Sequence, residues 1–268
     1  MTLQADIDRR IQEYYGGVFD ERARLTTRSA QGPLEFDRVQ ELVRSHVPAG
    51  SRIIDIGGGA GAHAVALRDA GYEVMLIDPV QNHVDAARRS GLDAQVDDAR
   101  DLPFSDAEFE AAIMLGPLYH LAEPEARDLA IAEAVRVTRQ GGHIFAGAIS
   151  RFIAFGQLYL TTDPATGDTD EWIRLLRDGK PSPRIRFPVG HFHTSEELSD
   201  ELSRDGIADV EVHGIEGPAG LFLEQVPADA GPDAAMAART IARASSSTPG
   251  IRDFSGHLLG IGVVQRAG

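Results

Sequence analysis

The sequence has no cysteine, which excludes disulfide bonds, thiolate metal sites and cysteine nucleophiles. It also lacks any apolar run of the roughly 20 residues that a membrane-spanning helix needs. The first ten residues, MTLQADIDRR, are charged and do not have the apolar core of a signal peptide. We therefore expect a cytoplasmic location and no membrane partner.

Basic residues are scarce: 26 Lys and Arg face 41 Asp and Glu, which gives a formal net charge of −15, and only one residue, Lys180, is a lysine. Binding to a nucleic acid needs Lys and Arg side chains that displace counterions. We therefore expect a small-molecule substrate and no nucleic-acid partner. The length of 268 residues suits one large α/β domain with an insertion, or two small domains. The sequence leaves the choice between a monomer and a homodimer open.

Two segments near the start have apolar residues at helical spacing, which predicts two helices. They are LQADIDRRIQEYY, ended by Gly16 and Gly17, and LEFDRVQELVRSHV, ended by Pro48. We interpret residues 1–48 as a helical cap on a larger domain that spans residues 49–268.

Short apolar strands alternate with helices in that larger domain, which predicts a parallel sheet with helices on both faces. The first five expected strands are RIIDI, YEVMLID, LDAQV, FEAAIMLG and HIFAGAI. The alternation stops after Ser150, so we interpret residues 151–190 as a helical insertion. It resumes with the helix TSEELSDELSRDG, the strand ADVEVHGI, a helix around 232–244 and the strand HLLGIGVV.

The segment IIDIGGGAG places four glycines at the turn between the first strand and its helix. The free N–H groups and the positive dipole end of such a helix point at any ligand bound there. Gly57-x-Gly59-x-x-Ala62 fits a dinucleotide-binding turn, whereas Asp55-x-Gly57-x-Gly59-x-Gly61 fits a turn that binds S-adenosylmethionine (SAM). Asp78 ends the second strand, where it can accept hydrogen bonds from ribose hydroxyls in either case.

Later segments favour SAM, because together with the glycine turn they resemble the class I SAM-dependent methyltransferases. DDARDLPF resembles the segment that contacts adenine, IMLGPLYHL the fourth-strand motif, and RQGG the turn before the fifth strand, although it lacks the usual proline. LGPLYHL also resembles a group of small bacterial members. The resemblance implies a Rossmann-like α/β fold with seven strands in the order 3-2-1-4-5-7-6 and only strand 7 antiparallel.

The resemblance also implies how SAM is held. Asp78, followed by Pro79, would bind the ribose, and Leu115 would place its carbonyl near the SAM ammonium. We further expect Tyr15 over the sulfonium and Arg24 on the SAM carboxylate, although a core tyrosine and a solvent-facing arginine remain alternatives. By the same resemblance, Gly57, Gly58 and Gly59 would lie under the methionine part of SAM, shortly after Asp55. Asp98 and Ala99 would bind the adenine.

Methyl transfer is an in-line displacement, so the enzyme must hold the acceptor against the methyl carbon and, for some acceptors, remove a proton. Tyr119 and His120 follow the fourth strand, and His193 leaves the insertion. All three are candidates for the catalytic site, with a structural role as the alternative. Arg151 could bind an anionic substrate or form an ordinary salt bridge. No spacing of carboxylates and histidines predicts a metal site.

The insertion is apolar on one side, with Phe155 and Trp172 among its aromatic residues. We favour a lid over the substrate, with a helical pair packed on the sheet edge as the alternative. The fourth strand lacks the Asn/Asp-Pro-Pro-Tyr element of amide and adenine N-methyltransferases, which argues against those acceptors. Whether the acceptor atom is O, N or C stays open. A SAM-consuming enzyme that cyclises SAM instead of transferring its methyl group and a non-catalytic SAM-binding protein remain alternatives, and a nicotinamide oxidoreductase is a minor one.

Overall fold

The computed structural model describes residues 3–17, 21–155, 169–181, 185, 187–204, 206–229 and 231–265. Its centre is a seven-stranded sheet with the strand order β3-β2-β1-β4-β5-β7-β6. Neighbouring strands are parallel, except that β7 runs antiparallel to β5 and β6. The predicted fold is therefore confirmed. The strands are β1 (Arg52–Ile56), β2 (Glu73–Asp78), β3 (Asp93–Val96), β4 (Phe109–Met114), β5 (Thr138–Ile149), β6 (Ile207–Gly214) and β7 (His257–Val264).

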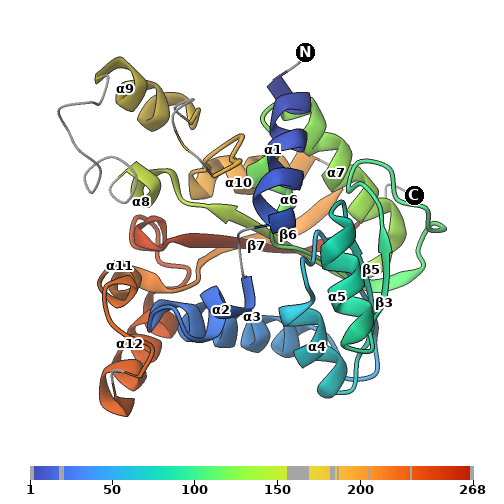
Figure 1. The fold of residues 1–268 in the computed structure, drawn as a ribbon, viewed down its shortest axis with the longest axis horizontal. Helices are drawn as coiled ribbons and strands as arrows, with labels where there is room; N and C mark the ends of the chain where they lie inside the picture. Colours follow the sequence, from blue (N-terminus) through green and yellow to red (C-terminus); the bar gives the residue numbers. More distant parts are fainter. Residues whose placement is uncertain are drawn as a thin grey trace.

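Helices cover both faces of the sheet, with α3 and α4 on one side and α7 and α10 on the other (Figure 1). None of the helices in the described part of the chain is both long and apolar enough to cross a membrane. The helices are α1 (Leu3–Gly17), α2 (Glu21–Thr26), α3 (Gln31–His46), α4 (Ala62–Asp69), α5 (Gln81–Arg89), α6 (Pro117–His120), α7 (Pro124–Val137), α8 (Arg151–Phe155), α9 (Thr169–Asp178), α10 (Ser195–Arg204), α11 (Gly220–Glu224) and α12 (Pro232–Ser245).

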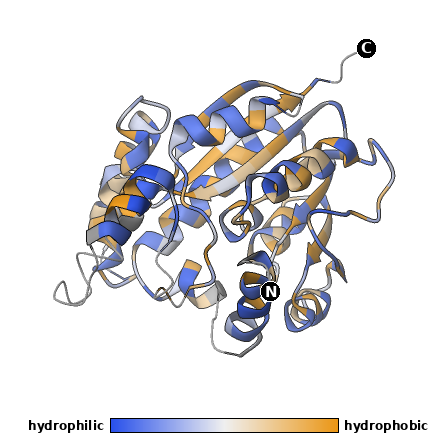
Figure 2. Ribbon diagram, turned by 90° about the horizontal axis from the view of Figure 1, so that it is seen from above, coloured by the Kyte–Doolittle hydropathy of each residue, from blue (hydrophilic) through white to orange (hydrophobic). Residues whose placement is uncertain are grey.

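The two cores follow from the alternation of side chains along each strand. In β1, Ile54 and Ile56 pack with α7 and α10, whereas Ile53 points to the other face and packs with α3 and α4. All three side chains are fully buried. Figure 2 shows hydrophobic residues concentrated along the central strands. Because both faces are covered, the carboxyl ends of the strands form the sheet edge that is open to a ligand.

Two local features differ from the sequence prediction. The short helix α2 lies between the two predicted N-terminal helices. The segment RQGG, predicted as a turn before the fifth strand, lies inside β5. Gly141 has φ of +76° there, and a Cβ on Gly142 would lie 2.5 Å from the carbonyl oxygen of Glu110. The glycines thus allow β5 to approach β4 closely at an irregular register, which the pattern of apolar residues did not reveal.

The region predicted as an insertion contributes α8, α9 and the segment that leads to α10. Leu175 of α9 forms a small apolar cluster with Val189 and Phe192. The Arg10 guanidinium of α1 donates a 2.6 Å hydrogen bond to the carbonyl of Ile185. Contacts therefore join α1 to this region, although they lie far apart in the sequence. The side chain of Phe155 and residues 156–168 lie outside the described part.

Candidate functional site

The glycine turn has a backbone that requires glycine. Gly57, Gly59 and Gly61 have φ of +70°, +58° and +87°, a region that other residues rarely adopt. A Cβ on Gly58 would lie 2.6 Å from the Oδ2 atom of Asp55. A side chain is therefore excluded at Gly58 by its neighbours and disfavoured at Gly59 by the backbone conformation, and the bare backbone of the turn lines a pocket.

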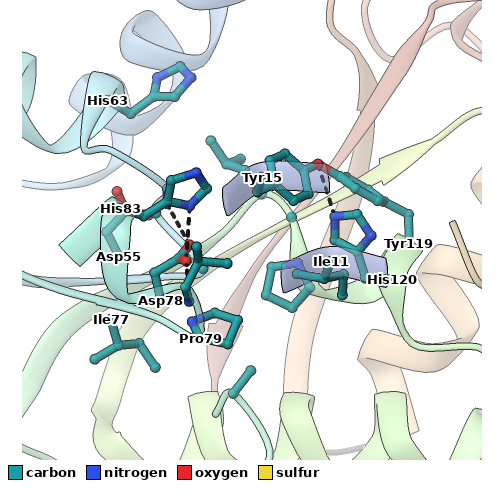
Figure 3. Close-up of a pocket in the computed structure, with 18 of the residues that line it drawn as sticks. Ile11, Tyr15, Asp55, His63, Ile77, Asp78, Pro79, His83, Tyr119 and His120 are labelled. Atoms are coloured by element: carbon teal, nitrogen blue, oxygen red, sulfur yellow. Dashed lines mark hydrogen bonds and ion pairs between the residues drawn. The ribbon is translucent and has the colours of Figure 1, made fainter. Parts of the chain in front are cut away.

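That pocket lies beyond the carboxyl ends of β1 to β4, where open α/β sheets bind their ligands (Figure 3). It encloses about 1190 Å³, including space open to solvent, and α1 contributes Ile11 and Tyr15 to its wall. All of the residues that the sequence assigned to the cofactor line it: Tyr15, Arg24, Asp55, Gly57, Gly58, Gly59, Asp78, Pro79, Asp98, Ala99 and Leu115. Tyr119 and His120 line it as well.

Asp78 is the centre of a hydrogen-bond network at the end of β2. Its carboxylate accepts from the backbone N–H of Gly59 and of Val80, each at 2.9 Å. The Nδ1 atom of His83 lies 3.0 Å from the same carboxylate, as Figure 3 shows. His83 was not among the site residues predicted from the sequence. Its position in the first turn of α5, shortly after Asp78, was the feature of the sequence that could have identified it.

Asp98 follows β3 and is bound by Arg100. The Arg100 Nε donates to Asp98 at 2.8 Å, and its Nη2 also reaches Asp8 of α1 at 3.3 Å. Burial raises the pKa of Asp98, but hydrogen bonds from Arg100 outweigh it and hold that pKa below its usual range. Asp98 is thus an ionised hydrogen-bond acceptor, and Arg100 ties α1 to this end of the pocket.

Asp55 is a buried acid at the start of the glycine turn. Its side chain is 2 % exposed, and its Oδ2 atom has no hydrogen-bond partner among the described residues. Burial, together with the charge of Asp78, raises the pKa of Asp55 to about 7. A buried acceptor without a donor is costly, so the site fits a ligand with a positively charged or N–H group. The SAM ammonium is such a group, and the glycine cradle leaves room beside it.

Tyr15 and His120 meet across the pocket (Figure 3). The Tyr15 hydroxyl lies 3.2 Å from Nε2 of His120, and the Nδ1 atom of His120 lies 2.7 Å from the carbonyl oxygen of Pro188. A carbonyl only accepts, so Nδ1 carries the hydrogen, and Nε2 of the neutral ring accepts from the tyrosine. The structure thus defines the tautomer that leaves a basic nitrogen on the pocket side.

Arg24 and His257 belong to a charged cluster at the other end of the pocket. Arg24 donates from its two terminal nitrogens to the two oxygens of Glu35, at 2.6 and 2.8 Å. The Nδ1 atom of His257 lies 2.5 Å from Glu216. Ligand atoms of Glu35, Glu216 and His257 lie within 4.8 Å of one another, which is a metal-like spacing. Arg24 already balances one of the two carboxylates, and a proton on His257 balances the other.

His257 was not predicted from the sequence, because its partners Glu35 and Glu216 come from distant segments. It starts β7, opposite Ile149 at the carboxyl end of β5. That position, at the ligand-binding edge of the sheet, was the available signal.

Three other candidates do not line the pocket. His193 is fully buried, and its Nε2 lies 3.1 Å from Glu201, which also binds the buried Arg127. Arg151 is 3 % exposed and pairs with Glu197 of α10. Trp172 is partly buried against the apolar cluster of the insertion. The structure therefore places His193 against the buried Arg127–Glu201 ion pair and Arg151 in an ion pair with Glu197, and neither side chain lines the pocket.

Comparisons with known proteins agree with this geometry. Residues 54–146 match the family described as a methyltransferase domain. A demethylmenaquinone methyltransferase from Renibacterium salmoninarum is 31% identical over 153 residues, which are 55% of this chain and 63% of that protein. A tRNA (carboxymethyluridine(34)-5-O)-methyltransferase from Xenopus tropicalis is 30% identical over 131 residues, which are 49% of this chain and 20% of that protein. The chain thus spans less than two thirds of either relative.

A solved structure from Thermotoga maritima, described as a SAM-dependent methyltransferase and possible histamine N-methyltransferase, has the same fold. Its TM-score is 0.61 at 19% identity, with 97% of this chain and 99% of that chain covered. Residues 54–146 thus match a methyltransferase domain, and the sheet order and the glycine turn agree with the fold of this SAM-dependent methyltransferase.

Proposed function

We propose that this protein transfers the methyl group of SAM to a small-molecule acceptor. One observation carries the proposal: a single pocket joins the glycine turn, the aspartates Asp55, Asp78 and Asp98, and a histidine with a basic nitrogen on the pocket side. SAM, when bound, supplies a methyl group on a positively charged sulfur. The residues around it hold it and complete the site.

We place the adenosine part of SAM at the ends of β2 and β3. Asp78 would accept from the ribose hydroxyls and Asp98 from the adenine amino group. The methionine part would pass over Gly57 to Gly59, with its ammonium near Asp55 and the carbonyl of Leu115. Arg24 stays our candidate for the SAM carboxylate, shared with Glu35. The order of these residues along the sheet edge supports this placement.

His120 is our candidate for the general base. A lone pair of the acceptor would form the new bond to the methyl carbon while the carbon–sulfur bond breaks and its electrons remain on sulfur. The acceptor's proton would pass to Nε2 of His120, because Pro188 keeps the hydrogen of the ring on Nδ1. Tyr15 occupies Nε2 in this structure, and the acceptor would replace it there. Tyr119, which adjoins this histidine and lines the pocket, would position the acceptor.

The enclosure of the pocket supports a small acceptor. The ring of Phe187, in the insertion, lies 5.4 Å from that of His120 and 5.7 Å from that of Tyr14 in α1. We propose that α1 and the insertion together form a lid. The net charge of −15 disfavours a nucleic acid, although one relative named above acts on tRNA. A tRNA acceptor would therefore need a basic surface supplied from elsewhere.

A screen with methyl-labelled SAM tests the function. Purified protein is incubated with pools of small hydroxyl, amine and carbon-acid compounds and with bulk tRNA. We expect S-adenosylhomocysteine (SAH) and a labelled small molecule as products. Methylthioadenosine as the product would instead support cyclisation of SAM. Tight SAM binding with no product from any pool would support a non-catalytic SAM-binding protein.

A further inference from the structure

His257 lies at the end of the pocket that is far from the proposed adenine site. In the strand order, β4 and β5 separate β7 from the glycine turn of β1, which amounts to roughly 14 Å at the usual strand spacing. His257 nevertheless lines the same pocket. It therefore lies past the glycine turn, beside Arg24 and Glu35 at the methionine end of the proposed donor site, where an acceptor can bind next to SAM.

The imidazole of His257 is held in one orientation. Its Nδ1 donates to Oε1 of Glu216, whose side chain is completely buried. The second oxygen of Glu216 accepts from the hydroxyl of Ser255 at 2.5 Å and from the backbone N–H of His257 at 3.0 Å. Burial alone would raise the pKa of Glu216, but the charge of His257 and these hydrogen bonds lower it to about 2. The carboxylate is thus a fixed, ionised partner.

The other ring nitrogen, Nε2, has no hydrogen-bond partner among the described residues. The side chain of His257 is 28 % exposed, in contrast to the buried Glu216 behind it. Since His257 lines the pocket and its Nδ1 points at Glu216, Nε2 is the polar atom that it offers to a ligand.

The surrounding charges favour a protonated ring. Arg24, Glu35 and Glu216 are the charged groups around His257, and together they carry one net negative charge. Burial lowers the pKa of His257, but the charges of Glu35 and Glu216 outweigh burial and raise it to about 9. At neutral pH, Nε2 therefore carries a hydrogen and part of a positive charge.

Glu35 does not accept a hydrogen bond from Nε2–H of His257. Both of its oxygens accept from Arg24, and its Oε2 lies 3.5 Å from Nδ1 of His257, on the side of the ring away from Nε2. The outward atom of the cluster is thus a cationic N–H donor.

We propose that His257 anchors the methyl acceptor through Nε2–H, and that the acceptor is a small molecule with an anionic oxygen of the carboxylate type. The inference rests on the proposed function and adds the substrate class to it. The oxygen that binds His257 and the atom that receives the methyl group are different atoms of the acceptor. His120 takes the proton of the methylated atom, whereas His257 binds the anionic oxygen.

Matched probes test the anchor. Protein saturated with SAH is titrated with benzoate and with its neutral isostere benzamide, and binding is followed by calorimetry and by the His257 ring resonance. The variant His257→Gln removes the charge, and His143→Gln in β5 is the control because His143 does not line the pocket. We expect benzoate to bind wild-type protein at least tenfold more tightly than benzamide and to lose this advantage only in His257→Gln. Equal binding of the two probes, or benzoate binding unchanged in His257→Gln, would overturn the anchor.

Two further measurements separate the competing outcomes. Benzoate binding to wild-type protein should weaken as pH rises through about 9, where His257 loses its proton; constant binding from pH 7 to 10 contradicts the anchor even if the variant does not fold. The SAM Kd should stay within threefold in His257→Gln. A tenfold rise would show that His257 binds the donor's own carboxylate, which overturns the anchor but keeps the function. A wild-type protein that does not bind SAH overturns both.

Discussion

Tyr15 and His120 are 105 residues apart in the sequence, yet the hydroxyl of one lies 3.2 Å from Nε2 of the other. This contact closes α1 over the end of β4 and occupies the nitrogen that we propose as the base. His120 is fixed from its other side by the carbonyl of Pro188. The N-terminal helix, the fourth strand and the insertion therefore converge on one imidazole.

Replacement of His120 by glutamine tests its role as base. Glutamine keeps a polar group but takes no proton, so kcat should fall by about 10² to 10⁴, while the SAM Kd stays within threefold. The control is His143→Gln, which should retain full activity. Steady-state kinetics with an acceptor from the screen measure the effect. A kcat in His120→Gln equal to that of the control would remove the histidine from the chemistry.

Replacement of Phe187 by alanine tests the lid. The ring of Phe187 packs against those of His120 and Tyr119, so its loss should loosen the pocket around the proposed general base. We expect the KM for the acceptor to rise at least fivefold and the SAM Kd to change by less than threefold. Phe222→Ala is the control, because that side chain is 76 % exposed on α11. An equal effect on both ligands would indicate a purely structural role for the insertion.

Asp55 makes stability depend on pH. Its pKa is about 7 in the folded protein and about 3.9 in an unfolded chain, so the folded state binds more protons between these values. The stabilisation from the protonated form is fully present below pH 3.9 and is lost as pH rises through 7. Wild-type protein should therefore lose about 2 kcal/mol of stability between pH 5.5 and 8.5, and Asp55→Asn should remove this loss.

Urea unfolding at both pH values measures this effect, with Asp93→Asn as a control on an exposed carboxylate at the start of β3. A wild-type protein and an Asp55→Asn variant with the same pH dependence would show that Asp55 is ionised throughout.

Glu201 should support stability rather than catalysis. It is the counter-charge of the buried Arg127 and the partner of His193, so Glu201→Gln should cost about 3 to 5 kcal/mol. Burial raises the pKa of Glu201, but His193 and Arg127 lower it to about 2. Its stabilisation is therefore full above the unfolded pKa near 4.3 and is lost as pH falls towards 2.

The stability difference between wild-type protein and Glu201→Gln should consequently narrow below pH 4 in urea unfolding, while Glu73→Gln, on an exposed residue of β2, changes little. The folded variant should keep its SAM Kd. A large loss of SAM affinity in a fully folded Glu201→Gln would instead connect this ion pair to the pocket.

Local sequence patterns predicted most of the fold and many of the residues that line the pocket. The strands, the glycine turn and Asp78 follow one another within about 25 residues, so their spacing already implies their positions at one sheet edge. His120 could also be identified from the sequence, because it comes soon after the end of a predicted strand.

Pairings between distant segments could not be predicted in this way. Arg24 binds Glu35 and His257 binds Glu216 only because α2, α3 and β7 meet at one corner of the pocket. His193, which the sequence made an equal candidate because it lies in a loop, turns inward and contacts Glu201, the partner of the buried Arg127. A sequence shows which residues can do chemistry, whereas the tertiary contacts decide which of them face a ligand.

We propose that this pocket binds SAM through the carboxylate of Asp78. The decisive experiment is a calorimetric titration of SAM and of NAD into wild-type protein, Asp78→Ala and the control Asp93→Ala. We predict that SAM binds wild-type protein and the control with the same Kd, that Asp78→Ala weakens SAM binding at least tenfold, and that NAD does not bind. Binding of NAD in preference to SAM, or SAM binding that does not change in Asp78→Ala, would contradict it.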